Sequence, residues 1–423
     1  MPEFLTEYQT ELDEKSKRII SDYEDKKTNK FYEPYFKQYW NAHKLTDEIP
    51  TEKVLAVDGS MGVAPIGNGG IFYVVRALGI DKEKRYRKLF ADFNYSNERN
   101  FGNFVGRLME WTEHLVMIDA IKDGFRDYIL LDGSIYGRLA HVPLEWDLLN
   151  SKGFMIEYFN TIIELLSLCR KHSIPLIGIS KESKTSFFRE FLIKEMIKDI
   201  VPDERLRKKL ISVTLNDRRL GMQEAEKTGD QRIITLINEL VHRKPDSLLV
   251  LNRSNNSNSS GYTQPLILGG SQRWHRAVRE IERSPRSYIT SNFPVSSEDD
   301  EFMDSATEVV QRLTEVPAII SFHLLPQVID TPMRIDIPAW YFNSPYKLKE
   351  VGWPEPINID LDIILKLISS GYCGLENYNI WLSHVDSEVK LKRNVFEDLY
   401  LNKFEEIIGT YSTARGYRRV RYP

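Results

Sequence analysis

The sequence predicts an α/β protein in which a mixed sheet is flanked by helices, and two patterns indicate this fold class. Short apolar runs typical of buried strands occur at residues 53–58 (KVLAVD), 128–132 (YILLD) and 175–179 (PLIGI). Longer segments with helical periodicity lie between these runs. Strand–helix alternation is typical of parallel strands that are covered on both faces, so we expect part of the sheet to be parallel.

Further elements follow from the same patterns. The first 43 residues predict two helices that separate at Pro34, because proline interrupts a helix. We expect additional strands at 70–78, 87–95, 318–323 and 333–337. We expect helices at 97–123, 154–172, 186–200, 361–370 and 386–408. The polar run at 253–261 (RSNNSNSSG) predicts a loop. These elements indicate an N-terminal helical extension at 1–48 and a main domain at 49–423 with an insertion at about 200–290.

The bulk composition argues against several classes of protein. Hydrophobic residues make up 42% of the 423 residues, which is ample for a large core. The net charge of -4 argues against a general polyanion binder but permits an acidic metal site beside a local basic track. The two cysteines, Cys169 and Cys373, indicate neither a disulfide framework nor a cysteine zinc site. With no signal peptide and no apolar run of about 18 residues, we expect a cytoplasmic protein without membrane spans.

The most specific feature is a pair of similar phrases, VLAVDGS at 54–60 and YILLDGS at 128–134. Each places an aspartate, Asp58 or Asp132, at the end of an apolar run, with a glycine next so that the chain can turn at once. That geometry presents a carboxylate at the edge of the sheet, where ligands of open α/β sheets bind. If the two strands are neighbours, we expect Asp58 and Asp132 to lie close together.

Two carboxylates at close range repel each other unless a cation neutralises them. Oxygen ligands suit Mg²⁺ or Mn²⁺, and such an ion can activate a water and stabilise the leaving oxygen of a phosphodiester. The alternative is that Asp-Gly-Ser makes a tight turn twice, since Asp-Gly is a common turn dipeptide. The occurrence of both phrases after apolar runs gives the metal interpretation more weight, and the turn interpretation stays open.

The helix expected before the second phrase offers a third carboxylate from Glu110, Glu113 or Asp119. On a helical wheel, Glu113 lies at the flank of the apolar stripe, Asp119 near its centre and Glu110 nearly opposite. A flanking side chain can reach a site at the edge of the sheet, so Glu113 is the first choice and Glu110 the second. An ordinary surface position is the alternative for each glutamate.

With its motifs in this order, the sequence resembles the NurA nuclease family, whose core is similar to RNase H-like folds. The resemblance spans roughly residues 50 to 390. It rests on VDGS at 57–60, a helix with Arg107, Glu110 and Glu113, LDGS at 131–134, Ser180 and Lys181 after a strand, RIDIP at 334–338, and Ser383 with His384.

The resemblance implies a nuclease that acts on DNA ends and single strands with Mn²⁺ or Mg²⁺ as cofactor. It implies a homodimer that works with a hexameric HerA-type ATPase in DNA end processing or in defence against foreign DNA. Asp58, a helical glutamate, Asp132, a tyrosine and His384 would form the catalytic set, with His384 joining the carboxylates as a metal ligand. Tyr372 and Tyr378 are both candidates, because neither keeps the family's Gly-Tyr-Pro pattern. A surface histidine at a helix start is the alternative for His384.

Basic residues offer DNA contacts. Lys181 follows the third apolar run and can neutralise a phosphate near the metal. Arg273 and Arg276 begin a stripe that recurs every three or four residues, and Trp274 beside it can stack on a base. Interleaved glutamates make salt bridges within the helix the alternative. The C-terminal run at 415–423 (RGYRRVRYP) is equally compatible with a binding segment and a solvated tail.

Two other functions stay open. A magnesium-dependent phosphotransferase would need a phosphate-binding loop, but GNGG at 67–70 lacks the lysine of a GxxxxGK[ST] motif. A non-catalytic adaptor of the same fold would bind DNA or a partner without cleaving DNA.

Overall fold

The computed structural model describes residues 2–24, 26–46, 53–96, 101–242, 244–257 and 259–409. The strands are β1 (Trp40–Ala42), β2 (Val54–Pro65), β3 (Ile71–Ile80), β4 (Arg85–Asn94), β5 (Tyr128–Asp132), β6 (Leu176–Ser180), β7 (Gly261–Thr263), β8 (Leu266–Leu268), β9 (Ile319–Leu325), β10 (Met333–Pro338) and β11 (Glu355–Pro356). The helices are α1 (Pro2–Glu24), α2 (Lys26–Gln38), α3 (Phe101–Lys122), α4 (Ile135–Leu139), α5 (Phe154–Lys171), α6 (Phe187–Ile200), α7 (Glu204–Asn216), α8 (Arg218–Lys227), α9 (Gln231–His242), α10 (Asp246–Ser257), α11 (Gln272–Arg283), α12 (Pro285–Asn292), α13 (Asp300–Leu313), α14 (Asp362–Gly371), α15 (Ile380–Val389), α16 (Arg393–Val395) and α17 (Asn402–Ile408). Three short segments are η1 (Ser296–Glu298), η2 (Ala339–Phe342) and the π-helical η3 (Phe396–Leu401).

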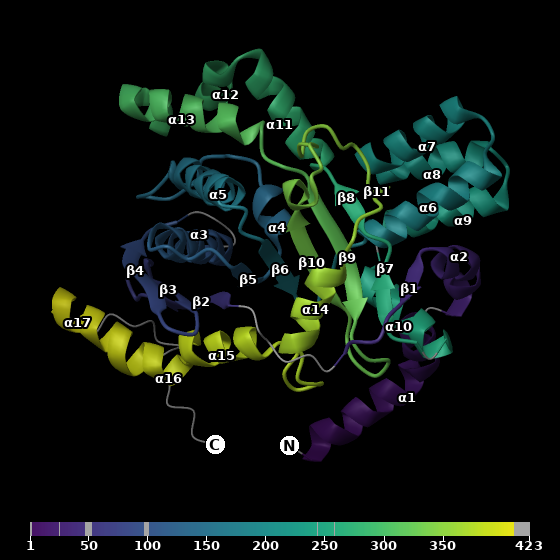
Figure 1. Cartoon of the computed structure of the whole chain (residues 1–423), viewed down its shortest axis with the longest axis horizontal. Helices are drawn as coiled ribbons and strands as arrows, with labels where there is room; N and C mark the ends of the chain where they lie inside the picture. Colours follow the sequence, from purple (N-terminus) through teal and green to yellow (C-terminus); the bar gives the residue numbers. More distant parts are fainter. Residues whose placement is uncertain are drawn as a thin grey trace.

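A mixed sheet of 11 strands crosses the described part of the molecule (Figure 1). Its main path follows the order β1-β7-β9-β10-β6-β5-β2-β3-β4, and β8 joins it beside β9 while carrying β11. β5 runs parallel to β2 and β6 runs parallel to β5, whereas β3 is antiparallel to both β2 and β4. The predicted α/β class with a mixed sheet is confirmed. The order β4-β3-β2-β5-β6 agrees with the RNase H-like core expected from the sequence.

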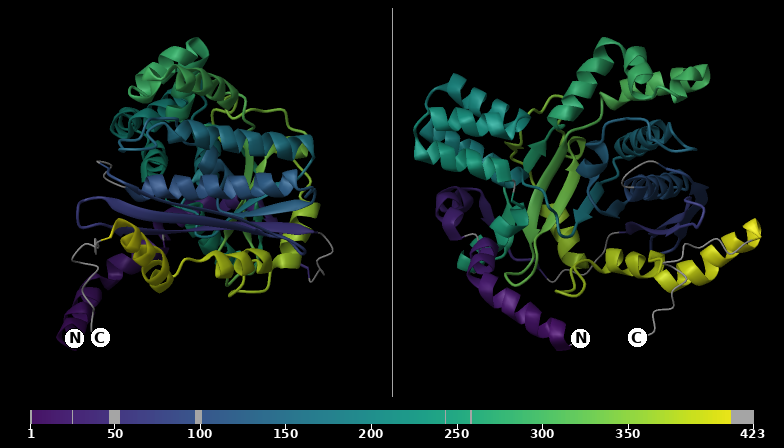
Figure 2. Two further views of the ribbon diagram at one scale, coloured as in Figure 1. Left: turned by 90° about the vertical axis from the view of Figure 1, so that its left-hand side faces the viewer. Right: turned by 180° about the vertical axis from the view of Figure 1, so that it is seen from behind.

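The two faces of the sheet belong to separate cores, because successive side chains of a strand point to opposite faces. On one face, Val57 and Leu131 pack with α3 and α5 in the main core. On the other face, Ala56 and Leu130 pack with α14 and α15 in a second core. Figure 2 shows α3 and α5 on one side of β2–β4 and the C-terminal helices, in yellow, on the other side. The sheet therefore lies between α3 and α5 on one face and the C-terminal helices on the other.

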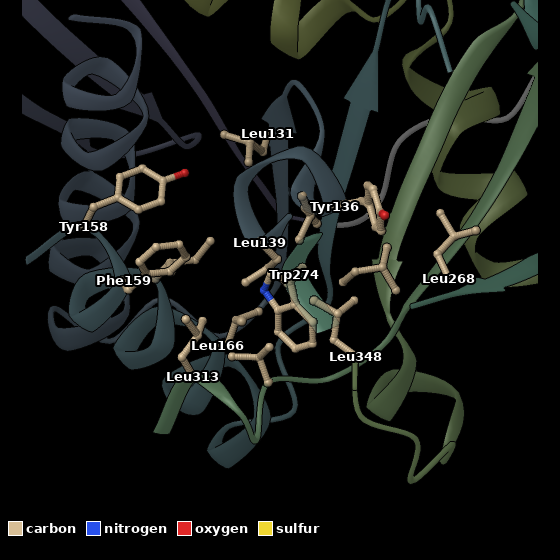
Figure 3. Packing of buried hydrophobic residues seen from close by; sticks show 14 of the residues in the cluster. Leu131, Tyr136, Leu139, Tyr158, Phe159, Leu166, Leu268, Trp274, Leu313 and Leu348 are labelled. Carbon is tan, nitrogen blue, oxygen red and sulfur yellow. The ribbon is translucent and has the colours of Figure 1, made fainter. Parts of the chain in front are cut away.

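Apolar side chains from several helices meet in the main core. Trp274 of α11 lies among Leu139 of α4, Leu166 of α5, Leu313 of α13 and Leu348 (Figure 3). This packing attaches α11, which lies within the expected insertion, and α13, which follows it, to the core beside the sheet. No described helix combines the length and the apolar character needed to cross a membrane.

Three expected elements differ from the structure. Pro34 lies inside α2 instead of separating two helices, and Trp40–Ala42 pairs with β7, so the segment 1–48 contributes a strand to the main sheet. The polar run predicted as a loop continues α10 as far as Ser257. The helix expected at 386–408 is interrupted, because α15 ends at Val389 and the chain is extended at Lys392 before α16. A polar run indicates exposure to solvent and does not by itself decide the backbone conformation.

Candidate active site

The two aspartates of the repeated phrase lie side by side on neighbouring parallel strands. Val57 of β2 is paired with Leu131 of β5, so the next residue of each strand is an aspartate. Both aspartates point to the face covered by α14 and α15, since they follow Ala56 and Leu130 by two residues. Burial raises the pKa of Asp58 to about 8, and the nearby Asp132 and Glu113 carboxylates add to that rise. Asp58 and Asp132 therefore lie close together in the structure, as the sequence predicted.

The first Asp-Gly-Ser phrase does not make the turn that the sequence predicted. β2 continues through it to Pro65, and Asp58 pairs with Leu78 of β3. The glycine is needed here for space: a Cβ atom on Gly59 would lie 2.5 Å from Oε1 of Glu113. Close approach of a helix, rather than a change of chain direction, accounts for this glycine.

The second Asp-Gly-Ser phrase does turn, as predicted. β5 ends at Asp132, Gly133 adopts a φ of 126°, and Ser134 caps α4 by accepting a hydrogen bond from the backbone N of Gly137. Ser134 Oγ also donates to Oδ2 of the fully buried Asp336, at 2.7 Å. The RIDIP strand thus supports the turn that carries Asp132.

Asp336 is itself held by two further groups. The backbone N of Tyr136 donates to its Oδ2 at 3.1 Å, and Nη2 of the buried Arg334 donates to the same oxygen at 2.9 Å. A buried carboxylate is stable only when it is paired and hydrogen bonded in this way. Asp336 is therefore a positioning residue that the sequence analysis did not assign.

Glu113 is the helical carboxylate that reaches the two aspartates. It lies on α3, is buried, and forms an ion pair with the buried Arg138 of α4. Burial raises the pKa of Glu113 to about 7 against the lowering effect of Arg138, and the Glu110 and Asp132 carboxylates also raise it. The first choice from the helical wheel is the side chain that the structure places beside Asp58.

Glu110 lies behind this cluster. Its Oε1 accepts from Nη1 of Arg107 at 2.6 Å, and its Oε2 accepts from the Tyr158 hydroxyl at 2.7 Å. Burial opposes ionisation, but Arg138 and Arg107 lower the pKa of Glu110 overall. Glu110 is engaged in this network and is not among the groups that raise the pKa of Asp58. Asp119, the third candidate, instead pairs with Lys88 on β4 at 2.7 Å between Oδ2 and Nζ.

The structure distinguishes between the two candidate tyrosines. The Tyr378 hydroxyl donates to Oδ2 of Asp132 at 2.9 Å, whereas the Tyr372 hydroxyl donates to Oδ2 of Asp330 at 2.7 Å. Lys181 joins the first pair: its Nζ lies 3.0 Å from Oδ2 of Asp132 and 4.5 Å from the centre of the Tyr378 ring. Tyr378 and Lys181 thus belong to the site around Asp132, and Tyr372 does not.

The structure does not bring His384 to the carboxylates. Its side chain is 53% exposed, and its Nε2 lies 3.2 Å from Oε1 of Glu388 on the same helix. Asp386, two residues further along α15, contributes to the raised pKa of Asp58 and of Tyr378, although burial is the largest cause of both. Two residues separate side chains by more than half a helical turn, so His384 and Asp386 face different ways. The expected place of His384 among the metal ligands is corrected accordingly.

The arginine stripe of α11 is exposed, but the tryptophan beside it is not. Arg273 and Arg276 are exposed and line a cavity of about 330 Å³ together with Tyr136. Trp274 is only 1% exposed, because α11 turns its apolar face into the main core. The prediction that Trp274 stacks on a base is therefore wrong. The basic run at 415–423 lies outside the described residues.

The donor set fits a hard divalent cation. Asp58, Asp132 and Glu113 supply carboxylate oxygens, and their mutual repulsion is of the kind that a cation relieves. Lys181 and Arg138 bind two of these carboxylates, and no three acidic, histidine or cysteine side chains in the described ranges are already arranged to hold an ion. An incoming cation would exchange places with these charged partners.

Comparison with known proteins identifies the family. The model of the NurA domain matches residues 52–391. The chain belongs to the NurA family. It is similar to the crystal structure of the NurA nuclease from Sulfolobus solfataricus, with a TM-score of 0.53, 12% sequence identity and 99% coverage of each chain. It also matches a crystal structure of NurA bound to dAMP and manganese, with a TM-score of 0.44, 14% identity, and coverage of 95% of this chain and 97% of that chain. Among curated proteins no match is found.

Three residues of this NurA domain were missed by the sequence analysis. They are Arg138, Asp336 and Asp386, which bind or face residues far from them in sequence. A lone arginine in the apolar segment 135–140 (IYGRLA) is the one local signal, because a charge buried in such a segment requires a partner. Asp336 lies within the RIDIP phrase, which by itself indicates no role for its carboxylate.

Proposed function

We propose that this NurA protein is a metal-dependent deoxyribonuclease that hydrolyses phosphodiester bonds at DNA ends and in single strands. The observation that carries the proposal is the juxtaposition of Asp58 and Asp132 on adjacent parallel strands, with Glu113 packed against Gly59. Asp132 and Glu113 add to the raised pKa of Asp58, and Asp132 adds to that of Glu113, so the cluster is a costly arrangement for a purely structural role. The same arrangement is useful for binding a cation beside a phosphodiester.

Each residue of the site has a proposed role. Asp58, Asp132 and Glu113 would hold Mn²⁺ or Mg²⁺, which when bound can activate a water and stabilise the leaving oxygen. Tyr378 orients the Asp132 carboxylate through its hydroxyl. Lys181, with 43% of its side chain exposed, offers a positive charge to a phosphate next to Asp132.

A second contact with DNA is proposed at α11. Arg273 and Arg276 project from this helix into solvent and present two charges that can bind phosphates. Family membership supports the finer proposals that the protein is a cytoplasmic homodimer and that it works with a hexameric HerA-type ATPase in DNA repair or antiviral defence. Size-exclusion chromatography and co-purification with such an ATPase test the two assemblies.

Cleavage of labelled single- and double-stranded DNA in Mn²⁺, Mg²⁺ or EDTA tests the activity. We expect cleavage with a divalent metal and none in EDTA. Asp58→Ala and Asp132→Ala should each lower the rate about 10³-fold, which corresponds to about 4 kcal/mol of lost transition-state stabilisation. Asp119→Ala is the matched control, since Asp119 lies on α3 but pairs with Lys88 on β4. This control should cleave at the wild-type rate.

The other outcomes identify the alternatives. DNA binding without cleavage in any metal, even with a HerA-type ATPase added, would overturn the nuclease proposal and support the adaptor. The phosphotransferase has no support from the glycine-rich segment, because Gly69 and Gly70 form the turn between β2 and β3, where the backbone N of Ile66 donates to Gly70 at 2.8 Å. Turnover of a nucleotide without DNA cleavage would revive it.

A further inference from the structure

A groove of about 620 Å³ crosses β3 and β4 on the face of the sheet that carries Asp58. Asp58 is paired with Leu78 on β3, and Leu78 is paired with Arg87 on β4. Paired residues of adjacent strands point to the same face, so these three side chains form a row from the carboxylate site to the edge of the sheet. Arg87 lies two strands from Asp58, which is about 10 Å.

Basic side chains dominate the groove. It is lined by Arg76, Arg85, Arg87 and Lys88, with Glu388 as the one acidic lining residue, but the side chain of Lys88 points to the opposite face of the sheet, because Lys88 is paired with Ala77 of the main core. Arg85 pairs with both oxygens of Glu388, at 2.5 and 2.9 Å, and Lys88 is neutralised by Asp119. The charges of Arg85 and Lys88 are therefore neutralised, and those of Arg76 and Arg87 remain to be considered.

Arg76 and Arg87 have no carboxylate partner among the described residues. Arg76 Nε donates to the backbone oxygen of Val389 at 2.7 Å, and its Nη1 donates to the Tyr400 hydroxyl at 3.5 Å. The exposed side chain of Arg87 makes no hydrogen bond or ion pair within the same part of the chain. In a protein with a net charge of -4, two uncompensated arginines in one groove form a local site for an anion.

The groove also offers apolar surface. Leu78 and Leu89 lie on its floor, and Tyr400 borders it from η3. A volume of this size is in the range of clefts that take small ligands, about 300–1,000 Å³, so it can hold a few nucleotides of a single strand. Arginines that follow a backbone, together with an aromatic ring, are the usual means of binding single strands.

We propose that this groove binds the phosphate backbone of a single DNA strand as the strand passes between the carboxylate site and the edge of the sheet at β4. The proposal rests on the nuclease function, and it adds a binding path to it. His384 contacts Glu388, which lines the groove, and it does not lie among the carboxylates of the active site. Arg87 is the residue that best tests the path, since the fold does not use its charge.

Binding of labelled oligothymidine in EDTA, where no cleavage occurs, tests the groove. Arg87→Glu should weaken binding of an oligomer of about 12 nucleotides roughly tenfold at low salt, and should lower the salt dependence by about one phosphate contact. Arg218→Glu makes the same charge change on the exposed start of α8 and should bind within about twofold of wild type. Glu388→Gln should strengthen binding, because it removes the carboxylate that neutralises Arg85.

The results separate this proposal from the nuclease proposal. Equal binding by wild type and Arg87→Glu, or no binding by wild type, overturns the groove, whatever the cleavage assay shows. Weaker binding by Arg87→Glu and Arg218→Glu alike also overturns it, since the effect would then be one of total charge. A selective loss with Arg87→Glu supports the groove even in a preparation that fails to cleave. Unchanged thermal unfolding of both variants confirms that the fold is intact.

Discussion

The two Asp-Gly-Ser segments have the same letters and different structures. In β2, residues 58–60 lie inside a strand that runs on to Pro65, and a helix packs tightly against the glycine. In the loop after β5, residues 132–134 end the strand, the glycine takes a positive φ, and the serine starts α4. The aspartates nevertheless come to lie side by side, because the two strands are in parallel register.

This difference shows that the short motif specifies a carboxylate after an apolar run. It does not specify the backbone conformation or the packing around that carboxylate. Gly59 is required because Glu113 needs the volume that a side chain would occupy. Gly133 is required because its φ of 126° is a conformation that other residues rarely adopt. Gly59 therefore leaves space for the Glu113 carboxylate, and Gly133 allows the backbone to turn.

Exchanging each glycine for alanine is the strongest test of this comparison. In Gly59→Ala the new Cβ would displace Glu113, and we expect activity to fall about 100-fold, as a misplaced catalytic group typically causes. In Gly133→Ala the nearest neighbour, Nη2 of Arg138, lies at 3.5 Å, so strain of about 1–3 kcal/mol should appear in stability instead. Measurements of kcat/KM and of urea unfolding separate the effects. Equal losses of activity in both variants would mean that the glycines have the same role.

The pH dependence of metal binding tests whether both segments contribute to one site. The raised pKa values of Asp58, about 8, and Glu113, about 7, mean that a metal ion must displace protons below those values. For each proton that the metal displaces, the affinity for Mn²⁺ should therefore rise about tenfold per pH unit at pH values below about 7. The affinity should become constant above a pH of about 8. Calorimetric titration at several pH values measures it.

The stability of the metal-free protein depends on pH in the opposite direction to its affinity for Mn²⁺. A carboxyl whose pKa is higher in the folded protein than in the unfolded chain stabilises the fold at low pH, and that contribution is lost as the pH rises through the folded value. The metal-free protein should therefore become less stable as the pH rises toward about 8, and Asp58→Asn should reduce this loss. A pH-independent Mn²⁺ affinity in the wild type would contradict the coupled carboxylates.

Replacing the serine of each segment, Ser60 or Ser134, should give the smallest difference between the two segments, and this difference is in the free energy of unfolding. Ser134→Ala removes an N-cap and a hydrogen bond to the buried Asp336, so we expect a loss of about 1–2 kcal/mol. Ser60 accepts one hydrogen bond, from the backbone N of Leu391 at 2.8 Å, and Ser60→Ala should lose about 0.5 kcal/mol. Urea unfolding of both variants compares them. A larger loss for Ser60→Ala would show that the first segment depends on its serine more than the second does.

Much of the site could be predicted because its main signals are local. Apolar runs marked β2 and β5, and helical periodicity placed Glu113 at the flank of α3. The choice between Tyr372 and Tyr378 could not be made, because Tyr378 contacts Asp132 across 246 positions of the chain. Trp274 was assigned to solvent because periodicity reveals a helix with two faces and does not show which neighbours cover each face.

The sequence by itself determined the α/β class, the apolar strands, the two aspartates that follow them and the helix that offers a third carboxylate. These features depend on backbone preferences and side-chain periodicity over a few residues. Only the tertiary structure decided that β2 continues past Asp58, that Arg138 pairs with Glu113, and that Asp336 supports the second turn. Such contacts join segments far apart in the chain, and their geometry depends on how complete elements pack, which no local pattern encodes.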